Sequence, residues 1–306
     1  MTPQNILIVG ATGKQGGSAL KALLELPDGT SRFHIFALTR NAQSERAKRL
    51  ASDHKGAVSL IEGDITNPRP IFASQPEGLI HCIFIVTDPR AKVPEEQQAI
   101  PLIDEAVAHG VKHIVFTSVD RGGDEKSWTN PTNIKHFLAK HNIEIYLRDK
   151  AEKEGGSKFT WTILRPVAFM DNLNPGFLCS LFTAMWDAAL SPNTKLQLVA
   201  TRDIGIFAAK ALSDPSAWSG KALGLAGDEL TLTEARAIFQ RVVGKPLPQT
   251  WTILGRGVMW GMKEMGDMFT FFEREGYGVD IEALKREAPV QNLETWLRDT
   301  SDWLNE

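Results

Sequence analysis

A histidine and a lysine four residues apart, His136 and Lys140 in the sequence HFLAK, are the side chains best suited to chemistry. They lie early in a helical pattern that runs from about 133 to 153. The unperturbed pKa of histidine is about 6.5, so His136 can act as an acid at neutral pH. Two interpretations are open: His136 protonates a developing alkoxide, or it only forms a local hydrogen bond.

A second candidate pair has the pattern Tyr-x-x-x-Lys, at Tyr146 and Lys150. The strand that ends at Ser118 reaches the carboxyl edge of the predicted sheet, where ligands of open α/β sheets bind. The first turns of the following helix are nearest to that edge, and they carry His136 and Lys140. Tyr146 is ten positions beyond His136, which places it about 15 Å further along the helix axis. We therefore expect Tyr146 to pack elsewhere.

Two hydroxyl groups end the strand before this helix, at Thr117 and Ser118 in VKHIVFTSVD. A hydroxyl at this position can polarise a substrate carbonyl, or it can cap the strand end. We predict Ser118 as a third catalytic candidate beside Lys140 and His136.

A glycine-rich turn stands near the start of the chain, with glycines at positions 10, 13 and 16. It follows the apolar run NILIVG and precedes the helical pattern GGSALKALLEL. A strand-to-helix turn presents unpaired N–H groups and the positive end of the helix dipole, which favour a phosphate. Gly10 permits the tight turn, Gly13 lets the backbone approach a pyrophosphate, and Gly16 permits close packing of helix on strand. This context predicts a dinucleotide site.

The end of the second predicted strand reads Leu38-Thr39-Arg40-Asn41. An acidic residue here would accept hydrogen bonds from a ribose 2′-hydroxyl, whereas an arginine neutralises a 2′-phosphate. Arg40 occupies this position, and no acid follows until Glu45. The sequence therefore predicts NADP(H) as the cofactor.

The elements that position these residues alternate between strand and helix. Further β-rich runs occupy 33–40, 57–65, 78–88 and 159–166. This alternation predicts an α/β fold with a doubly wound parallel Rossmann sheet and a smaller, mostly helical C-terminal domain for substrate or partner. The predicted domains are residues 1–170, to which residues 196–227 partly return, and residues 171–306.

Composition excludes several classes of function. The 306 residues are 42% hydrophobic and 23% charged, with a formal net charge of −3 and no long block of one sign. A nucleic-acid-binding face is therefore not expected. Cys82 and Cys179 form no CxxC pair, and Gly110 separates His109 from His113, so no metal site is predicted. We found no membrane-spanning run and no signal peptide, and expect a cytoplasmic protein.

The chain resembles the NmrA-like family, atypical members of the short-chain dehydrogenase/reductase superfamily. The stretches that carry the likeness are GATGKQGG, LTRN, EGDI, HGVKHIVFTSVD, HFLAK, TILRPVAFMDN, RDIG and LAGDELTLTEA. The resemblance implies a Rossmann domain that carries NADP(H) and a small C-terminal domain that closes a cleft. In the family's own pattern, histidine takes the place of the catalytic tyrosine and the lysine is kept.

The resemblance also implies roles for single residues. Arg40 would contact the 2′-phosphate, Asp64 the adenine, and Thr87 the nicotinamide-side ribose, which Lys140 anchors in the superfamily. The residues implied for the pyrophosphate turn are Gly10, Thr12, Gly13, Lys14, Gln15 and Gly16.

The substrate candidates lie on segments that follow the sheet strands. The segment RPVAFMDNLNPGF is expected to pass over the nicotinamide and to present Phe169, Met170 and Asn172. Trp128, in a turn-rich loop, is a candidate lid residue. Trp260 belongs to an aromatic and methionine-rich stretch, 257–278, that packs in a core or borders an apolar pocket.

Two functions are open at this point. The first is an NADPH-dependent oxidoreductase that reduces a bulky hydrophobic carbonyl, imine, iminium or quinone-like compound. The second is a non-catalytic NADP(H) sensor that docks on a regulatory protein such as a transcription factor. An exposed apolar patch on the second domain favours sensing, and an enclosed cleft favours catalysis. We favour the oxidoreductase because Lys140 is kept and the second domain is rich in aromatic residues.

Overall fold

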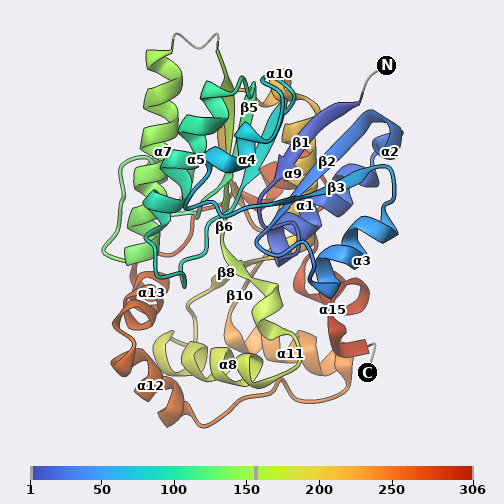
Figure 1. Cartoon of the computed structure of the whole chain (residues 1–306). Helices are drawn as coiled ribbons and strands as arrows, with labels where there is room; N and C mark the ends of the chain where they lie inside the picture. The colour runs from blue at the N-terminus through green and yellow to red at the C-terminus, as the bar shows by residue number, and fades with distance from the viewer. Residues whose placement is uncertain (1–2, 155–157, 305–306) are drawn as a thin grey trace. The chain divides into compact units, whose positions relative to one another are not determined.

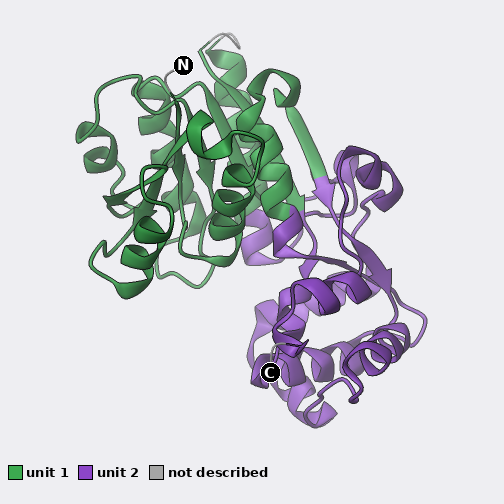
Figure 2. Ribbon diagram, turned by 90° about the vertical axis from the view of Figure 1, so that its right-hand side faces the viewer, with its two compact units in different colours: residues 1–118, 139–165, 204–223 green, residues 119–138, 166–203, 224–306 purple. Residues whose placement is uncertain are grey.

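The computed structural model describes residues 3–154 and 158–304, which form two compact units (Figure 2). The first unit contains residues 1–118, 139–165 and 204–223. The second contains residues 119–138, 166–203 and 224–306. The chain therefore passes several times from one unit to the other.

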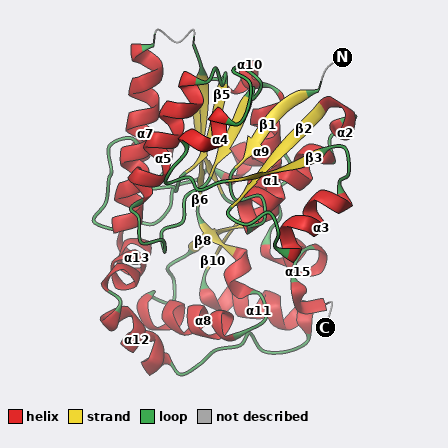
Figure 3. Cartoon of the chain, in the orientation of Figure 1, coloured by secondary structure: helices red, strands yellow, loops and turns green. Residues whose placement is uncertain are grey.

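A seven-stranded sheet in the order β3-β2-β1-β4-β5-β6-β9 forms the centre of the first unit, with its strands yellow in Figure 3. Every neighbouring pair from β3 to β6 is parallel. This order and the flanking helices confirm the predicted α/β Rossmann fold class. The strands are β1 (Gln4–Ile8), β2 (Phe33–Thr39), β3 (Val58–Glu62), β4 (Cys82–Ile85), β5 (His113–Thr117), β6 (Thr160–Pro166) and β9 (Lys221–Leu225).

Helices cover the sheet, and α5 and α7 run beside each other (Figure 1), where Tyr146 of α7 bonds to Asp104 of α5. After β6 the chain enters the second unit, and it returns to the first unit within α9, at residue 204. The helices are α1 (Lys14–Leu24), α2 (Gly29–Arg32), α3 (Glu45–Asp53), α4 (Arg69–Ala73), α5 (Glu95–Ala108), α7 (Lys135–Lys153), α9 (Thr201–Ser213) and α10 (Pro215–Trp218).

The central strands are short, continuous apolar runs because both of their faces are covered. All four residues of β4 and all five of β5 are buried. The β-rich run 78–88 is longer than the strand it contains. Gly78 has φ +74°, a left-handed conformation that interrupts extended backbone, and β4 begins only at Cys82.

The second unit is mostly helical around a three-stranded sheet in the order β10-β8-β7. Strands β7 and β10 have two and three residues, too short to show a period of two in the sequence. The strands are β7 (Ala168–Phe169), β8 (Leu196–Val199) and β10 (Asp228–Leu230). The helices are α6 (Asp124–Ser127), η1 (Met170–Leu173), α8 (Phe177–Ala189), α11 (Leu232–Val243), α12 (Thr252–Gly261), α13 (Lys263–Arg274), α14 (Ile281–Glu287), α15 (Leu293–Asp299) and η2 (Asp302–Leu304).

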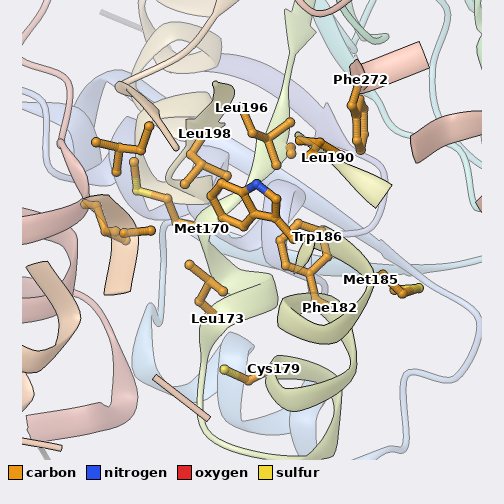
Figure 4. Packing of buried hydrophobic residues seen from close by; sticks show 14 of the residues in the cluster. Met170, Leu173, Cys179, Phe182, Met185, Trp186, Leu190, Leu196, Leu198 and Phe272 are labelled. Carbon is orange, nitrogen blue, oxygen red and sulfur yellow. The ribbon is translucent and has the colours of Figure 1, made fainter. Parts of the chain in front are cut away.

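Trp186 of α8 lies in the core of the second unit, among Leu196, Leu198 and Phe182 (Figure 4). The aromatic stretch 257–278 contributes to the same core, in which Phe269, Phe271 and Phe272 are buried. Trp260 and Met262 of this stretch are instead exposed. Within the described ranges, no helix is long and apolar enough to cross a membrane.

Candidate functional site

The glycine turn between β1 and α1 has a backbone that only small residues tolerate. Gly10 has φ +67°, and the Gly13 N–H donates to its carbonyl at 2.7 Å. A Cβ at Gly16 would lie 2.3 Å from the Gly10 oxygen, far inside van der Waals contact. Gly10 therefore closes the turn and Gly16 lets α1 approach it.

The start of α1 fits a phosphate group. Its first turn carries no acidic side chain, and Gly13 and Lys14 are exposed there. Thr12 and Gln15 are half-buried beside them. The unpaired N–H groups of a helix N-terminus bind anions, and the first turn of α1 adds no negatively charged side chain that would repel one.

Arg40 and Asp64 stand at the ends of neighbouring strands, β2 and β3, and both are exposed. The Asp64 carboxylate accepts the backbone N–H and the hydroxyl of Thr66, both at 2.9 Å and both at Oδ1. These two bonds lower the pKa of Asp64 and outweigh the opposing effect of burial, and the charge of Arg40 lowers that pKa further. Asp64 is therefore a fixed anion near the Arg40 guanidinium.

Lys140 forms a buried cluster with Thr87 and Glu95. Its Nζ lies 2.9 Å from Glu95 Oε2 and donates to Thr87 Oγ1 at 3.0 Å. The Thr87 hydroxyl in turn donates to the same Glu95 oxygen. The side chains of Lys140 and Glu95 are 10% and 4% exposed. We did not predict Glu95 from the sequence, because nothing in its spacing relates it to Lys140, 45 residues away (140 − 95).

Ser118 belongs to another buried cluster, formed with Glu144 and Arg165. Its hydroxyl donates to Glu144 Oε1, and Arg165 donates to both oxygens of the same carboxylate, at 2.7 Å from Nη2 to Oε2. Both charged side chains are completely buried. Thr117 is similarly engaged, because its hydroxyl donates to Gln15 Oε1 at 2.6 Å. Each hydroxyl proton is thus committed within the protein.

His136 makes a carboxylate–histidine pair with Glu264 of α13, inside the second unit. Glu264 Oε1 accepts the His136 backbone N–H at 3.0 Å and lies 2.6 Å from the ring Nδ1. Burial raises the pKa of Glu264, but the two hydrogen bonds and the charges of His136 and Lys135 outweigh it and lower that pKa. An ionised carboxylate only accepts, so Nδ1 carries the proton and Nε2 is the atom that can exchange one. The sequence carries no signal for Glu264.

Tyr146 and Lys150 both bond to Asp104, at 2.5 Å and 2.9 Å, on the surface between α5 and α7. Burial, helped by the hydrogen bond and charge of Asp104, raises the pKa of Tyr146 to about 12. The tyrosine is therefore a poor acid or base at neutral pH, and Lys150 is paired with a carboxylate.

The substrate candidates of the second unit differ in exposure. Phe169 is half-buried in β7, and Asn172 is exposed in η1. Met170 has no exposed surface and lies in the hydrophobic core, so its side chain is a packing group (Figure 4). Trp260 is 91% exposed and lines a hollow of about 420 Å³ with Met259 and Phe269.

Trp128 follows the short helix α6 and is half-buried. The segment around it is braced by Arg121, a fully buried side chain that donates to the carbonyls of Val119, Ser127 and Asn130. Three charge-assisted hydrogen bonds therefore hold the backbone on both sides of Trp128.

The remaining titratable side chains considered from the sequence include His113, Cys82 and Cys179. His113 is buried between the hydroxyls of Thr160 and Thr162, and burial lowers its pKa to about 4. Burial also raises the pKa of the Cys82 thiol to about 12 and that of Cys179 to about 11, so neither is a thiolate at neutral pH. No group of three or more acidic, histidine or cysteine side chains in 3–154 or 158–304 could hold a metal ion.

Comparison with known families gives one match over nearly the whole chain. The model of the NmrA-like family matches residues 2–298. A curated relative, the NmrA-like family domain-containing oxidoreductase lnaB of Aspergillus flavus, is 26% identical over 298 residues. That alignment covers 89% of this chain and 84% of the relative.

Two solved structures share the fold. The NADPH-dependent quinone oxidoreductase QOR2 of Escherichia coli, solved with NADPH, superposes with a TM-score of 0.71 at 21% identity, covering 96% of this chain and 98% of its own. NmrA, a negative transcriptional regulator solved with NAD, superposes with a TM-score of 0.72 at 18% identity, covering 98% of this chain and 96% of its own. One structural relative is thus an enzyme and the other a regulator.

Proposed function

The chain belongs to the NmrA-like family, and on that premise we propose that it is an NADPH-dependent oxidoreductase that reduces a bulky hydrophobic carbonyl, iminium or quinone-like compound. The observation that carries this proposal is the Glu264–His136 pair, on the helix that also carries Lys140. The pair supplies a proton donor at a position where the sequence has no tyrosine.

The glycine turn supports the cofactor half of the proposal. Its exposed Gly13 and Lys14, and the acid-free first turn of α1, suit a pyrophosphate. Arg40, exposed at the end of β2, suits a 2′-phosphate, and Asp64 at the end of β3 suits the adenine. In this proposal Thr12, Gln15 and Gly16 complete the turn.

Lys140 supports the nicotinamide half. Thr87 and Glu95 hold its ammonium group, which also lies 5.6 Å from the centroid of the Phe116 ring. We propose that this ammonium binds a hydroxyl of the nicotinamide-side ribose. When bound, NADPH supplies the hydride. Reduction of a carbonyl also needs one proton at its oxygen, and we assign that proton to His136 Nε2.

Glu264 orients the imidazole and compensates the positive charge that His136 carries before it gives up the proton. An iminium acceptor needs no such proton, because the hydride neutralises a charge already present. Ser118 has no donor role in this scheme, since its hydroxyl proton goes to Glu144.

For the substrate we propose contacts from the second unit, whose Trp260 is exposed and whose Phe169 and Trp128 are partly so. Large aromatic surfaces suit an apolar, bulky molecule. Asn172, exposed in η1, is the polar candidate that would orient such a molecule.

The test is a titration followed by a turnover assay. Wild-type protein should bind NADPH more tightly than NADH, and Arg40→Ala should weaken NADPH by about 10 to 100-fold with little effect on NADH. Arg46→Ala, an exposed arginine of α3, is the matched control. Loss of reduced-nicotinamide absorbance should then depend on an added apolar quinone, ketone or iminium compound. Tight binding of NADPH without its consumption in the presence of any of these compounds would overturn the proposed enzymatic function.

One observation favours the second candidate, a non-catalytic NADP(H) sensor. Trp251, Ile253 and Trp260, in or beside α12, are 79%, 76% and 91% exposed, an unusual apolar surface for a free protein. A sensor requires NADP⁺ and NADPH to stabilise different conformations. Different tryptophan fluorescence or protease protection with the two cofactors, together with no turnover, would support a regulatory protein partner.

A further inference from the structure

The outer face of α12 carries large apolar side chains where a helix on a protein surface normally carries polar ones. Ile253, Arg256, Gly257 and Trp260 are spaced i, i+3, i+4 and i+7, so they share one face of the helix, which we call the α12 face. All four residues are exposed. The part of the chain that the structure describes therefore leaves the α12 face uncovered.

The opposite side of α12 is packed closely within the second unit, where α12 lies beside α8 and α13 (Figure 1). Gly255 is buried, and a Cβ added to it would lie 2.8 Å from the backbone of Ala184 in α8. A Cβ added to Gly266 of α13 would lie 2.7 Å from the Met259 carbonyl oxygen. Because a rotation of α12 that buried its outer face would break both contacts, the exposure of that face is built into the fold.

The segment that contains the α12 face is rich in positive charge. Residues 235–263 include five basic residues and no acidic one. Two of the five are paired with carboxylates of other helices. The other three, Lys245, Arg256 and Lys263, are exposed, and the Lys263 ammonium lies 3.6 Å from Asp267. Exposed apolar side chains and basic side chains together suit an anionic partner surface.

A second copy of the chain fits the α12 face poorly. In a twofold dimer the same surface of each copy meets the other. Arg256, in the middle of the face, would then lie near the same arginine of the other copy. Two like charges in a contact that excludes water repel each other, so this arrangement is disfavoured.

The aromatic residues of α12 suit a lipid surface. Trp251 is the N-cap of α12 and Trp260 its last residue but one, and both are largely exposed. Tryptophan favours the boundary between lipid headgroups and acyl chains, because its ring is apolar and its N–H group is polar. Arginine and lysine are attracted to anionic headgroups.

We propose that the α12 face binds the surface of a membrane that contains anionic phospholipids. Ile253 and Trp260 enter the boundary between headgroups and acyl chains, and Arg256 pairs with headgroup phosphates. With ten residues, about half the length of a spanning helix, α12 lies along the membrane surface. An apolar substrate dissolved in the bilayer would meet the same Trp260. The binding needs no NADPH, so this inference goes beyond the proposed function and does not depend on it.

Co-sedimentation of the full chain with lipid vesicles, without cofactor, tests the proposal. Wild-type protein should bind equimolar phosphatidylserine and phosphatidylcholine at least about 10-fold more tightly than phosphatidylcholine alone, because only the former is anionic. Added salt should weaken the binding to the anionic vesicles, because ions screen the attraction. No binding to either kind of vesicle, or equal binding to both, would overturn the proposal.

Two variants test whether the binding occurs at α12. Ile253→Ser should weaken binding to the anionic vesicles by about 10-fold or more, because it removes an aliphatic side chain from the contact. Arg256→Glu should weaken it by a similar factor, because it reverses a charge. The controls Leu304→Ser, an exposed leucine of η2, and Arg46→Glu, an exposed arginine of α3, should bind as wild type does. Unchanged binding by Ile253→Ser and Arg256→Glu would overturn the proposal.

A further measurement needs no variant. Trp251 and Trp260 are the exposed tryptophans among the described residues. Phospholipids brominated in their acyl chains should therefore quench part of the tryptophan fluorescence when they are included in the anionic vesicles. Binding without quenching would overturn the insertion of Trp260. A wild-type dimer in analytical ultracentrifugation that Ile253→Ser dissociates would assign the α12 face to a second copy of the chain and overturn the proposal.

Discussion

Glu264 holds His136 twice, through the backbone N–H at 3.0 Å and the ring Nδ1 at 2.6 Å. Because both bonds reach one carboxylate oxygen, the start of α7 and the orientation of the imidazole are fixed together. The sequence separates the two residues by 128 positions. The pair leaves Nε2 as the ring atom that can exchange a proton.

Glu264→Gln tests the importance of this pair. The amide can still accept the backbone N–H, but it no longer compensates a positive imidazole. We expect kcat for a carbonyl substrate to fall to a value between those of wild type and His136→Ala, for which a loss of about 10² to 10⁴ is expected. The Kd for NADPH should change little. A Glu264→Gln variant with wild-type kcat would show that the carboxylate only caps the helix.

Gly16→Ala tests the close approach of α1 to the glycine turn. The added Cβ would meet backbone atoms at 2.3 to 2.7 Å, which cannot move away as a side chain can. We expect the free energy of unfolding to fall by about 1–3 kcal/mol or more, and NADPH binding to weaken.

Gly257→Ala in α12 is the control for this change, because no atom beyond its chain neighbours and the backbone of its own helix lies within 4 Å of its added Cβ. Alanine is the better helix former, so this variant should gain about 0.5–1 kcal/mol. Denaturant titration of both variants measures the difference. A Gly16→Ala protein as stable as wild type would refute the packing argument.

The predicted elements and the observed ones agree where the pattern is local. The Gly10 turn, β2 with Arg40 after it, and the helix that carries His136 and Lys140 follow from apolar runs and glycine positions. Strands β7 and β10 could not be predicted, since two or three residues do not show a period.

The hydrogen-bond and ion-pair partners of the predicted site residues could not be predicted from the sequence either. Glu95, Glu264 and Glu144 are each acidic residues on helices, where most acidic residues are solvated. Only the folded arrangement brings Glu144 to Ser118 and Arg165. Met170 is a residue whose surroundings, too, could not be predicted from the sequence. Its position beside a strand end suggested a ligand contact, but its side chain is completely buried in a hydrophobic core.

Glu144→Gln tests whether the cluster under Ser118 is structural. It leaves the fully buried Arg165 without its countercharge, which costs about 3–5 kcal/mol of stability. Glu282→Gln, which breaks the exposed ion pair with Lys285, should change the free energy of unfolding little. Urea titration compares the two.

Ser118→Ala belongs to the same test. If Ser118 serves only the buried cluster, the variant should lose stability and keep the kcat of wild type. A stable Ser118→Ala protein with greatly reduced kcat would restore Ser118 as a donor to substrate.

His113 makes stability depend on pH. Its pKa is about 4 in the folded protein against 6.5 ordinarily, so the unfolded chain binds a proton first as the pH falls. The unfolded state is therefore favoured increasingly from pH 6.5 towards 4. The loss of folding free energy should reach about 3 kcal/mol near pH 4, because each unit of pKa difference between the folded and unfolded states corresponds to about 1.4 kcal/mol. His113→Gln should have a shallower dependence, measured by urea titration over this range, and an unchanged slope would contradict the assignment.

The most direct measurement of the central claim is the rate of NADPH consumption by wild type and His136→Gln, with a carbonyl and an iminium acceptor of similar shape. Both reactions need the bound cofactor, but only the carbonyl needs a proton. The proposed mechanism predicts a loss of about 10² to 10⁴ with the carbonyl and a far smaller one with the iminium compound. Equal losses with both acceptors, or no consumption of NADPH by wild type with either, would contradict it.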